Sequence, residues 1–406
     1  MNFKNLFYLN ALCLLLSFNI HAQEVIQWRG IDRKGVYNEK NLLKSWPEAG
    51  PALLWEFSGL GNGYGSPAIT SKNIFILGEI DTICYLYALD LSGKLVWKSK
   101  VGKEWTINYP GAHTTPTVVG DLVYVTTGFG TLACFETKDG NLKWSLDLLN
   151  DFHGRILDFG YSESPLIDGD YVFYMPGGID TNIVSLNRFT GKINWISKGL
   201  GEEAAYCSPL LINLPQRKIM VTFSMHSLLG IDINDGKVLW SHKQLGEGKV
   251  HVNTPLFEDG YIYYITGDGN GSVKLKLSDD GTQITEIWKN KAGDNVFGSF
   301  IKIDDYIYTS GYEIRNYKTL NATTSQLVDS LKFDRGSINY ADGLLYLYNE
   351  RGQVGLFKPS GPKMDLISSF KITKGTKAHY AHPVINKGIL YIRHGNSLLA
   401  YDIKAK

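Results

Sequence analysis

Residues 88–97, Ala-Leu-Asp-Leu-Ser-Gly-Lys-Leu-Val-Trp, form the stretch that decides the fold. An apolar strand ends at Asp90, a Ser-Gly turn reverses the chain, and a second strand leads to Trp97. Gly93 can take the positive φ that such a turn needs, and the Asp90 carboxylate can accept hydrogen bonds from amides in the turn. The stretch therefore predicts a β-hairpin that ends in tryptophan.

The same hairpin returns at residues 136–144, 187–195 and 232–240, and a longer version follows it. Successive tryptophans from Trp55 onward are separated by 42, 47, 51, 45 and 48 residues. One hairpin in every forty-odd residues is typical of a radial β architecture. Each hairpin tryptophan is expected to dock between neighbouring blades, with its indole N–H on a carbonyl. These structural residues are Trp97, Trp144, Trp195, Trp240 and Trp288.

A serine, threonine or histidine followed by proline, here called a proline pair, marks the start of most repeats. Proline is tolerated at the first residue of a strand. The pairs are Ser66-Pro67, Thr115-Pro116, Ser164-Pro165, Ser208-Pro209, Thr254-Pro255 and His382-Pro383. The last two prolines are 128 residues apart, which leaves room for two further repeats without the tryptophan hairpin. We expect these to open at residues 298–300 and at residues 339–340. Together the openings number eight.

The final repeat supplies only three strands, whereas residues 53–57 form a strand without a hairpin of its own. Pairing this strand with residues 398–401 would close the ring and remove two exposed sheet edges. We therefore predict an all-β protein, an eight-bladed β-propeller with four-stranded antiparallel blades. Residues 51–57 supply the outer strand of the last blade. Residues 23–50 are expected to be an irregular lead-in that lies along the body.

The first 22 residues are predicted to be a cleaved signal peptide, which leaves residues 23–406 as a single domain. Lys4 gives a weakly basic start, residues 11–18 are apolar, and residues 20–22 resemble a cleavage site. The apolar run is too short to span a membrane, and no other stretch approaches the required length. The sequence predicts a periplasmic or secreted protein without a transmembrane segment, and a monomer is expected.

Charge and cysteine content exclude several classes of partner and chemistry. Lysine plus arginine number 41 and aspartate plus glutamate number 40, so the chain shows no sign of binding nucleic acid. Cys84, Cys134 and Cys207 remain after the signal peptide, with no CxxC spacing. They are expected to be small buried apolar side chains.

The hairpin at residues 88–97 resembles the tryptophan-docking repeat of the pyrroloquinoline-quinone (PQQ)-like propellers. Residues 160–166 (GYSESPL), 176–178 (PGG) and 204–209 (AAYCSP) resemble bacterial PQQ-binding-like and polyvinyl-alcohol-dehydrogenase-like propeller proteins. The resemblance covers the whole chain after residue 22 and implies the fold. It also raises PQQ with calcium as cofactors. However, the chain lacks the vicinal cysteine pair that is typical of the alcohol dehydrogenases, and it has no CxxCH haem motif.

Residues just before each inner strand of a propeller face the mouth of its central channel. In this chain the expected funnel residues are Tyr64, His113, Glu163, Tyr206, His251, His379 and His382, with Thr114, Asn253, Phe297 and Tyr380 in the same register. Imidazole, carboxylate and phenol groups could bind a small polar ligand or a metal, or transfer protons. They could equally be the polar residues of a wet channel that bond one another or water.

No metal site is identified in the sequence. Residues 268–272 resemble the start of a calcium loop but lack its distal glutamate, and a hairpin turn explains them better.

Two functions remain open. The first is an exported module that binds a small polar ligand or another envelope protein through its funnel face. The alternative is a PQQ- and calcium-dependent dehydrogenase that oxidises an alcohol or sugar, with its catalytic residues unknown. Glycosidase or lyase action would need paired carboxylates, and only Glu163 falls in the funnel register.

Overall fold

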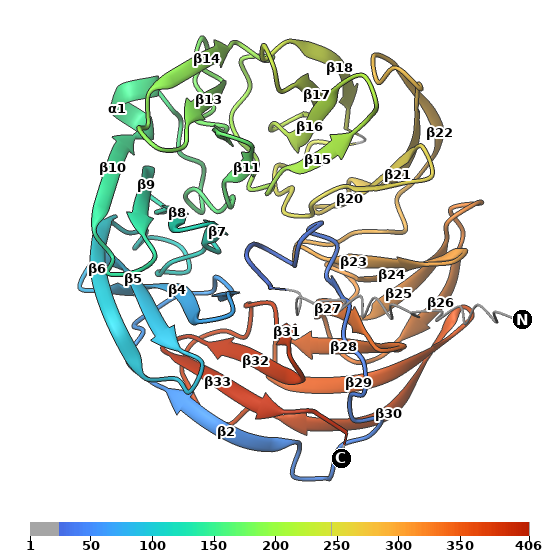
Figure 1. Cartoon of the computed structure of the whole chain (residues 1–406). Helices are drawn as coiled ribbons and strands as arrows, with labels where there is room; N and C mark the ends of the chain where they lie inside the picture. Colours follow the sequence, from blue (N-terminus) through green and yellow to red (C-terminus); the bar gives the residue numbers. More distant parts are fainter. Residues whose placement is uncertain (1–23, 245, 406) are drawn as a thin grey trace, which may run out of the picture.

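The computed structural model describes residues 24–244 and 246–405 and confirms the eight-bladed β-propeller (Figure 1). Eight sheets surround a central channel, and each contains four antiparallel strands. One sheet gains a fifth, parallel strand from the N-terminal segment. The predicted signal peptide lies outside the described residues. Within them, no helix is long and apolar enough to cross a membrane.

The first four blades use consecutive strands. Blade 1 comprises β3 (Ala68–Ile69), β4 (Asn73–Ile80), β5 (Ile83–Asp90) and β6 (Leu95–Lys103). Blade 2 comprises β7 (Thr117–Val119), β8 (Leu122–Thr126), β9 (Thr131–Glu136) and β10 (Leu142–Asp147), and is followed by the short helix α1 (Leu148–Phe152). Blade 3 comprises β11 (Leu166–Asp168), β12 (Tyr171–Tyr174), β13 (Ile183–Asn187) and β14 (Ile193–Ser197). Blade 4 comprises β15 (Leu210–Asn213), β16 (Lys218–Phe223), β17 (Ser227–Asp232) and β18 (Val238–Lys243).

The remaining blades include the two that lack the tryptophan hairpin. Blade 5 comprises β19 (Leu256–Glu258), β20 (Tyr261–Thr266), β21 (Gly271–Leu277) and β22 (Ile284–Asn290). Blade 6 comprises β23 (Phe300–Ile303), β24 (Tyr306–Ser310), β25 (Tyr317–Asn321) and β26 (Leu327–Leu331). Blade 7 comprises β27 (Gly336–Ala341), β28 (Leu344–Asn349), β29 (Gln353–Ser360) and β30 (Lys363–Lys371). Blade 8 begins with β31 (Val384–Asn386), β32 (Ile389–His394) and β33 (Ser397–Asp402).

The N-terminal strand closes the ring, as predicted. Strand β2 (Ala52–Phe57) pairs antiparallel with β33, so that Leu53 lies opposite Tyr401 and Phe57 opposite Leu398. Blade 8 is therefore assembled from both ends of the described chain, and β33 is paired on both of its edges.

Each hairpin tryptophan packs on the hairpin of the next blade. Trp97 donates its indole N–H to the carbonyl of Thr137 at 3.1 Å. Gly140 of that hairpin has φ +73°, and a Cβ there would come within 2.6 Å of the Trp97 ring. Glycine is thus required both by the turn and by the tryptophan. The same N–H to carbonyl bond joins Trp55 to Leu91, Trp144 to Arg188, Trp195 to Ile233, Trp240 to Gly281 and Trp288 to Ala322.

Blades 6 and 7 keep the strand pairing without the tryptophan. Their residues in the same register are Asp329 and Ser368. The Ser368 hydroxyl accepts a hydrogen bond from the backbone N–H of Trp46 at 2.9 Å, and the Trp46 ring packs edge-on against Phe370. A tryptophan from the N-terminal segment therefore covers the outer strand of blade 7.

The lead-in was expected to lie along the body. In the structure it crosses the central channel (Figure 1). Its residues contact innermost strands on several sides of the ring. Val25 bridges Ile69 of β3, and strand β1 (Val36–Tyr37) pairs parallel with β27. The inner strands present unpaired backbone carbonyl and N–H groups to the channel. A chain segment whose amides and guanidinium groups bond these carbonyls is therefore stabilised there.

The three cysteines of the described chain are buried, and none forms a disulfide. Cys84 and Cys134 lie within strands β5 and β9, whereas Cys207 precedes β15. Their expected role as small buried side chains is confirmed.

Candidate functional site: an aromatic-lined funnel cavity

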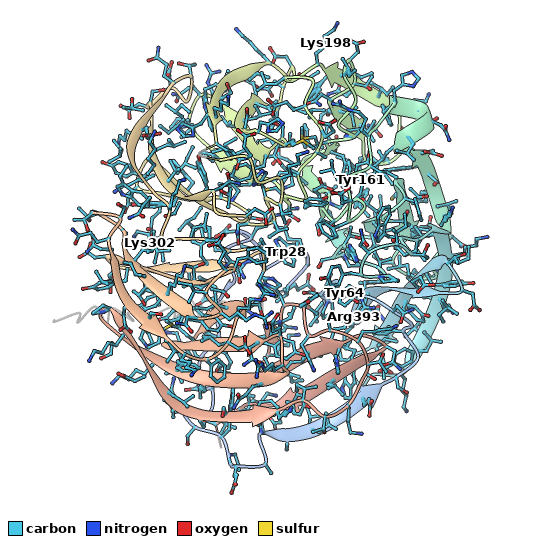
Figure 2. All side chains as sticks on the ribbon, turned by 180° about the vertical axis from the view of Figure 1, so that it is seen from behind. Trp28, Tyr64, Tyr161, Lys198, Lys302 and Arg393 are labelled. Carbon is cyan, nitrogen blue, oxygen red and sulfur yellow. The ribbon has the colours of Figure 1, made fainter. Side chains whose placement is uncertain are left out.

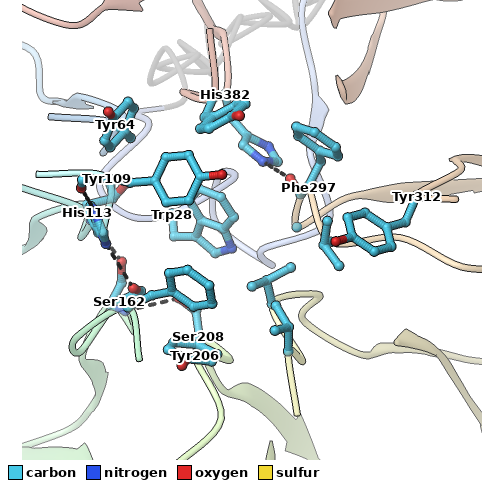
Figure 3. A pocket seen from close by; sticks show the side chains of 18 of the residues that line it. Trp28, Tyr64, Tyr109, His113, Ser162, Tyr206, Ser208, Phe297, Tyr312 and His382 are labelled. Carbon is cyan, nitrogen blue, oxygen red and sulfur yellow. Dashed lines mark hydrogen bonds between the residues drawn. The ribbon is translucent and has the colours of Figure 1, made fainter. Parts of the chain in front are cut away.

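A cavity of about 310 Å³ opens at the channel mouth where the inner strands begin (Figure 3). Its walls come from the loops that precede inner strands and from those that join second and third strands, together called the funnel-face loops. Trp28 of the lead-in lies below them, near the centre of the ring when the molecule is seen from behind (Figure 2). The lead-in therefore gives the channel a floor and converts a pore into a pocket.

Six rings form a continuous wall, which we call the aromatic collar. The collar comprises Tyr64, Tyr109, Phe159, Tyr206, Phe297 and Tyr380. Tyr380 is the hub of the collar, meaning that its ring contacts three others. Its ring centroid lies 5.7 Å from that of Tyr64, 5.6 Å from that of Tyr109 and 5.6 Å from that of Phe297. Phe159 continues the chain, 6.0 Å from Tyr109 and 5.9 Å from Tyr206. Tilted contacts at these distances are favourable aromatic pairs, so the rings support one another.

Six residues of the predicted funnel register line the cavity: Tyr64, His113, Tyr206, Phe297, Tyr380 and His382. His113 Nε2 lies 2.8 Å from the carbonyl of Tyr109, and its Nδ1 lies 3.3 Å from the Ser162 hydroxyl. Burial lowers the pKa of His113, so the ring is neutral and donates from Nε2. Its two bonds fix the loop that carries Tyr109 against the loop that carries Ser162.

His382 connects the wall to the floor. Its ring lies 4.4 Å from that of Trp28, and its Nδ1 lies 3.2 Å from Nη1 of Arg29. Burial, followed by the charge of Arg29, holds the pKa of His382 well below its usual range. A neutral imidazole accepts from Arg29 at Nδ1 and donates from Nε2 to the carbonyl of Phe297.

Glu163, His251 and His379 do not line the cavity, contrary to expectation. Adjacent side chains of an extended segment point to opposite sides. The neighbours of Glu163 and of His251 line the cavity, namely Ser162, Ser164, Val250 and Val252. Tyr380 takes the same place beside His379, whose ring stacks on His394 at 3.7 Å. The predicted register was one residue off at Glu163 and His251, whereas in the third loop the prediction included Tyr380, which lines the cavity, beside His379, which does not.

The Glu163 carboxylate holds two funnel-face loops from within the blade. It accepts hydrogen bonds from the backbone N–H groups of Ser162 and Tyr206 and from the Tyr174 hydroxyl, each at 3.2 Å. Burial raises the pKa of Glu163 to about 7. His251 is similarly enclosed: burial lowers its pKa to about 4, and its Nε2 lies 3.0 Å from the carbonyl of Met225. Both residues position loops and do not face the cavity.

Glu163→Gln is predicted to change how stability depends on pH. The carboxyl has an ordinary pKa of 4.5 and a folded pKa of about 7, so between these values the folded state binds more protons. Raising the pH through this window therefore lowers the free energy of unfolding of the wild type. Glutamine does not titrate. As the pH rises through this window, the free energy of unfolding of the wild type should therefore fall by up to about 3 kcal/mol relative to that of the variant. Urea unfolding of both proteins at pH 4.5 and pH 8 measures these free energies. If the difference between wild type and variant were the same at both pH values, the prediction would be wrong.

Several lining residues fell outside the predicted funnel register, among them Trp28, Tyr312 and Arg335. Trp28 belongs to the lead-in, and its position depends on a path through the channel that no repeat signals. Tyr312 lies between β24 and β25, in a loop that the inner-strand register does not include. Arg335 directly precedes β27, but blade 7 lacks both the proline pair and the tryptophan hairpin. Its position immediately before a strand opening was the only available signal.

The lining does not fit PQQ with calcium. PQQ is a tricarboxylate, and Arg335 is the only arginine or lysine among the lining residues. Across residues 24–244 and 246–405, no three histidine, cysteine, aspartate or glutamate side chains come together to hold a metal ion. The cavity offers instead ring faces, hydroxyl groups and one guanidinium.

Comparisons with known proteins agree on the propeller and its repeat. The sequence profile of the family described as outer membrane protein assembly factor BamB matches residues 84–357. The relative of that name from Shewanella oneidensis is 22% identical over 283 residues, which cover 67% of this chain and 65% of the relative. The one from Moranella endobia is 23% identical over 255 residues, covering 54% and 58%. The chain thus spans less than two thirds of the length of these relatives.

Solved structures of two functional kinds share the fold. BamB from Moraxella catarrhalis superposes with a TM-score of 0.65 at 12% identity, covering 87% of this chain and 99% of that one. A europium-containing methanol dehydrogenase superposes with a TM-score of 0.67 at 11% identity, covering 92% and 90%. Identities this low show the fold alone. The profile, in contrast, spans more than half of the chain, and the protein therefore belongs to the PQQ-repeat propeller family described as outer membrane protein assembly factor BamB.

Proposed function

We propose that the protein is an exported binding module that holds a small ligand in the funnel cavity. The supporting observation is a cavity of about 310 Å³ with aromatic walls and a closed floor. Ligand pockets are generally lined by aromatic and apolar side chains with a few polar groups that fix orientation, and start at about 300 Å³. The cavity matches this description at the small end of the range.

The cavity is held open before any ligand enters. Arg393 is fully buried and donates to the carbonyl of Gly65 at 3.2 Å and to that of Leu77 at 2.7 Å, which fixes the loop that carries Tyr64. Glu163 fixes Tyr206 in the same way, through the backbone. A preformed site loses little conformational entropy on binding, which favours affinity.

Export is part of the proposal and rests on the signal-peptide pattern of residues 1–22. Membership of a family described by outer membrane assembly supports a place in the cell envelope. Within that compartment, the periplasm and the cell exterior are both compatible with the proposal.

Tyr380→Ala tests the proposal by removing the hub of the aromatic collar. The probes are phenylacetate and its neutral amide, phenylacetamide, and their dissociation constants are measured by isothermal titration calorimetry. Loss of the ring contacts should weaken both probes about tenfold. Tyr171→Ala is the matched control, because Tyr171 is exposed at the end of β12 away from the funnel-face loops. Equal binding to both variants, or no binding to the wild type, would contradict the proposal.

A protein partner is a second candidate, favoured by a separate observation. Three aliphatic side chains on funnel-face loops are largely exposed: Ile107 at 61%, Ile179 at 65% and Ile314 at 62%. Apolar residues around a pocket are common where one protein docks on another. An envelope protein that docks here would protect these loops from hydrogen exchange, whereas a small ligand would protect only the collar.

A further inference from the structure

We infer that the funnel cavity selects aromatic carboxylates and that Arg335 is the residue that recognises the carboxylate. The inference rests on the proposed function and specifies its ligand class. It follows from the position of Arg335, from the charge balance around it, and from the walls that it faces.

Arg335 is held rigidly at the cavity wall. Its side chain is 15% exposed, and its Cζ lies 5.4 Å from the ring centroid of Phe297 and 5.0 Å from that of Tyr312. Its Nε donates to Glu350 at 3.0 Å, and its Nη1 donates to the carbonyl of Tyr312 at 2.9 Å. A guanidinium between two ring faces keeps its orientation without a ligand.

One end of this guanidinium is available to a ligand. In the part of the chain that the structure describes, Nη2 of Arg335 makes no hydrogen bond to another residue. Arginine binds carboxylates through pairs of N–H groups, and such charge-assisted bonds are stronger than neutral ones. A carboxylate in the cavity would therefore find a fixed donor.

The local charge balance favours an anion. Glu350 is shared between Arg335 and Arg315, whose Nη1 lies 2.8 Å from the other carboxylate oxygen. Two guanidinium groups and one carboxylate leave an excess of positive charge beside the cavity. Asp268 is the only acidic lining residue, and its pKa is raised by burial and by the nearby charge of Asp294. A carboxylate ligand would therefore be placed at Arg335 and away from Asp268.

The remaining walls specify the rest of the ligand. The aromatic collar and Trp28 offer ring faces on several sides, which favour a flat apolar group. A volume of about 310 Å³ suits a single ring with a short acidic side chain. Phenylacetate has this chemistry, and phenylacetamide has the same shape without the charge.

Calorimetry with these two probes tests the inference. The wild type should bind phenylacetate about tenfold more tightly than phenylacetamide, since one charge-assisted bond is gained. Arg335→Gln should remove that preference and leave the affinity for phenylacetamide within a factor of two or so. Arg315→Gln is the matched control: Arg315 shares Glu350 but does not line the cavity, so the preference should fall less than in Arg335→Gln.

The outcomes separate this inference from the proposed function. Equal affinity of the wild type for both probes would overturn the inference and leave the binding module intact, and this comparison needs no variant to fold. An equal loss of the preference in Arg315→Gln and Arg335→Gln would overturn the assignment to Arg335. Failure of both probes to bind would overturn both proposals.

The same chemistry occurs in free aromatic acids and in the C-terminal aromatic residue of a peptide. N-acetylphenylalanine distinguishes these sources because it adds one peptide group beside the carboxylate. Tighter binding than phenylacetate would identify a peptide terminus, and weaker binding a free acid. In either case the affinity should depend on Arg335.

Discussion

Deleting residues 23–57 is expected to abolish the folded ring and to leave a chain that aggregates. The deletion removes β2, which exposes the outer edge of β33 along the register from Leu53–Tyr401 to Phe57–Leu398. It also removes Val25, Tyr37, Leu42 and Trp46, which are buried in one apolar cluster with side chains of blades 1, 7 and 8. An unpaired edge beside an opened core favours association between chains. Size-exclusion chromatography and circular dichroism would measure the loss.

Complementation provides the control for this deletion. A synthetic peptide of residues 24–57, added during refolding, should restore a soluble monomeric ring, because the missing contacts are non-covalent. A truncated protein that is soluble and melts at the wild-type temperature would contradict ring closure by β2.

Arg33→Ala is expected to give a large loss of stability. The guanidinium is 4% exposed and donates to the carbonyls of Ser164, Pro209 and Pro165 at 3.2, 3.0 and 2.7 Å. Burial lowers the pKa of Arg33 to about 10, so it remains protonated at neutral pH. Its removal leaves the buried carbonyls of Ser164 and Pro209 without this donor, whereas the carbonyl of Pro165 still accepts from the Thr117 hydroxyl. The loss should cost about 3 kcal/mol.

Arg351→Ala is the matched control for this prediction. Its side chain is 73% exposed and is paired on the surface with Asp334. Exposed ion pairs contribute little, so its effect should stay below about 1 kcal/mol. Chemical unfolding of the two variants measures the difference. Equal stabilities would mean that the channel arginine does not hold blades 3 and 4 together.

The blades could be predicted because their signal is local and repeated. The turn glycine and the tryptophan before it, such as Gly140 and Trp97, recur at similar spacing, and the same ring contact is found at Gly93, Gly191 and Gly236. The closing strand could be predicted because one blade lacked a strand and one strand lacked a blade. Blades 6 and 7 were placed by length alone, since Asp329 and Ser368 take the tryptophan position there.

The path of the lead-in could not be predicted, because its partners are backbone carbonyls. Arg29 donates to the carbonyls of Ile338 and Phe300, and every residue of the chain has such a group. No side-chain pattern identifies which carbonyls in a propeller will be left unpaired at the axis. The floor of the cavity, and with it the difference between a pore and a pocket, therefore required the structure.

The candidate site could be predicted to the correct loops, but only to some of the correct side chains. Glu163 and His251 are one residue away from neighbours that do line the cavity. Alternation in an extended segment decides which neighbour points inward, and an error of one residue inverts the choice. Phe297 and Tyr380 lay in the predicted register, but their contribution as a connected wall depends on ring closure.

Fluorine NMR of protein labelled with 5-fluorotryptophan tests the central claim most directly, namely that the cavity above Trp28 is the ligand site. The Trp28 resonance is assigned by its absence from Trp28→Phe, and phenylacetate is then titrated. We predict a saturable shift of the Trp28 resonance, whereas the resonances of Trp144 and Trp240, which dock between blades, stay in place. A Trp28 resonance that does not move at saturating phenylacetate would contradict the account.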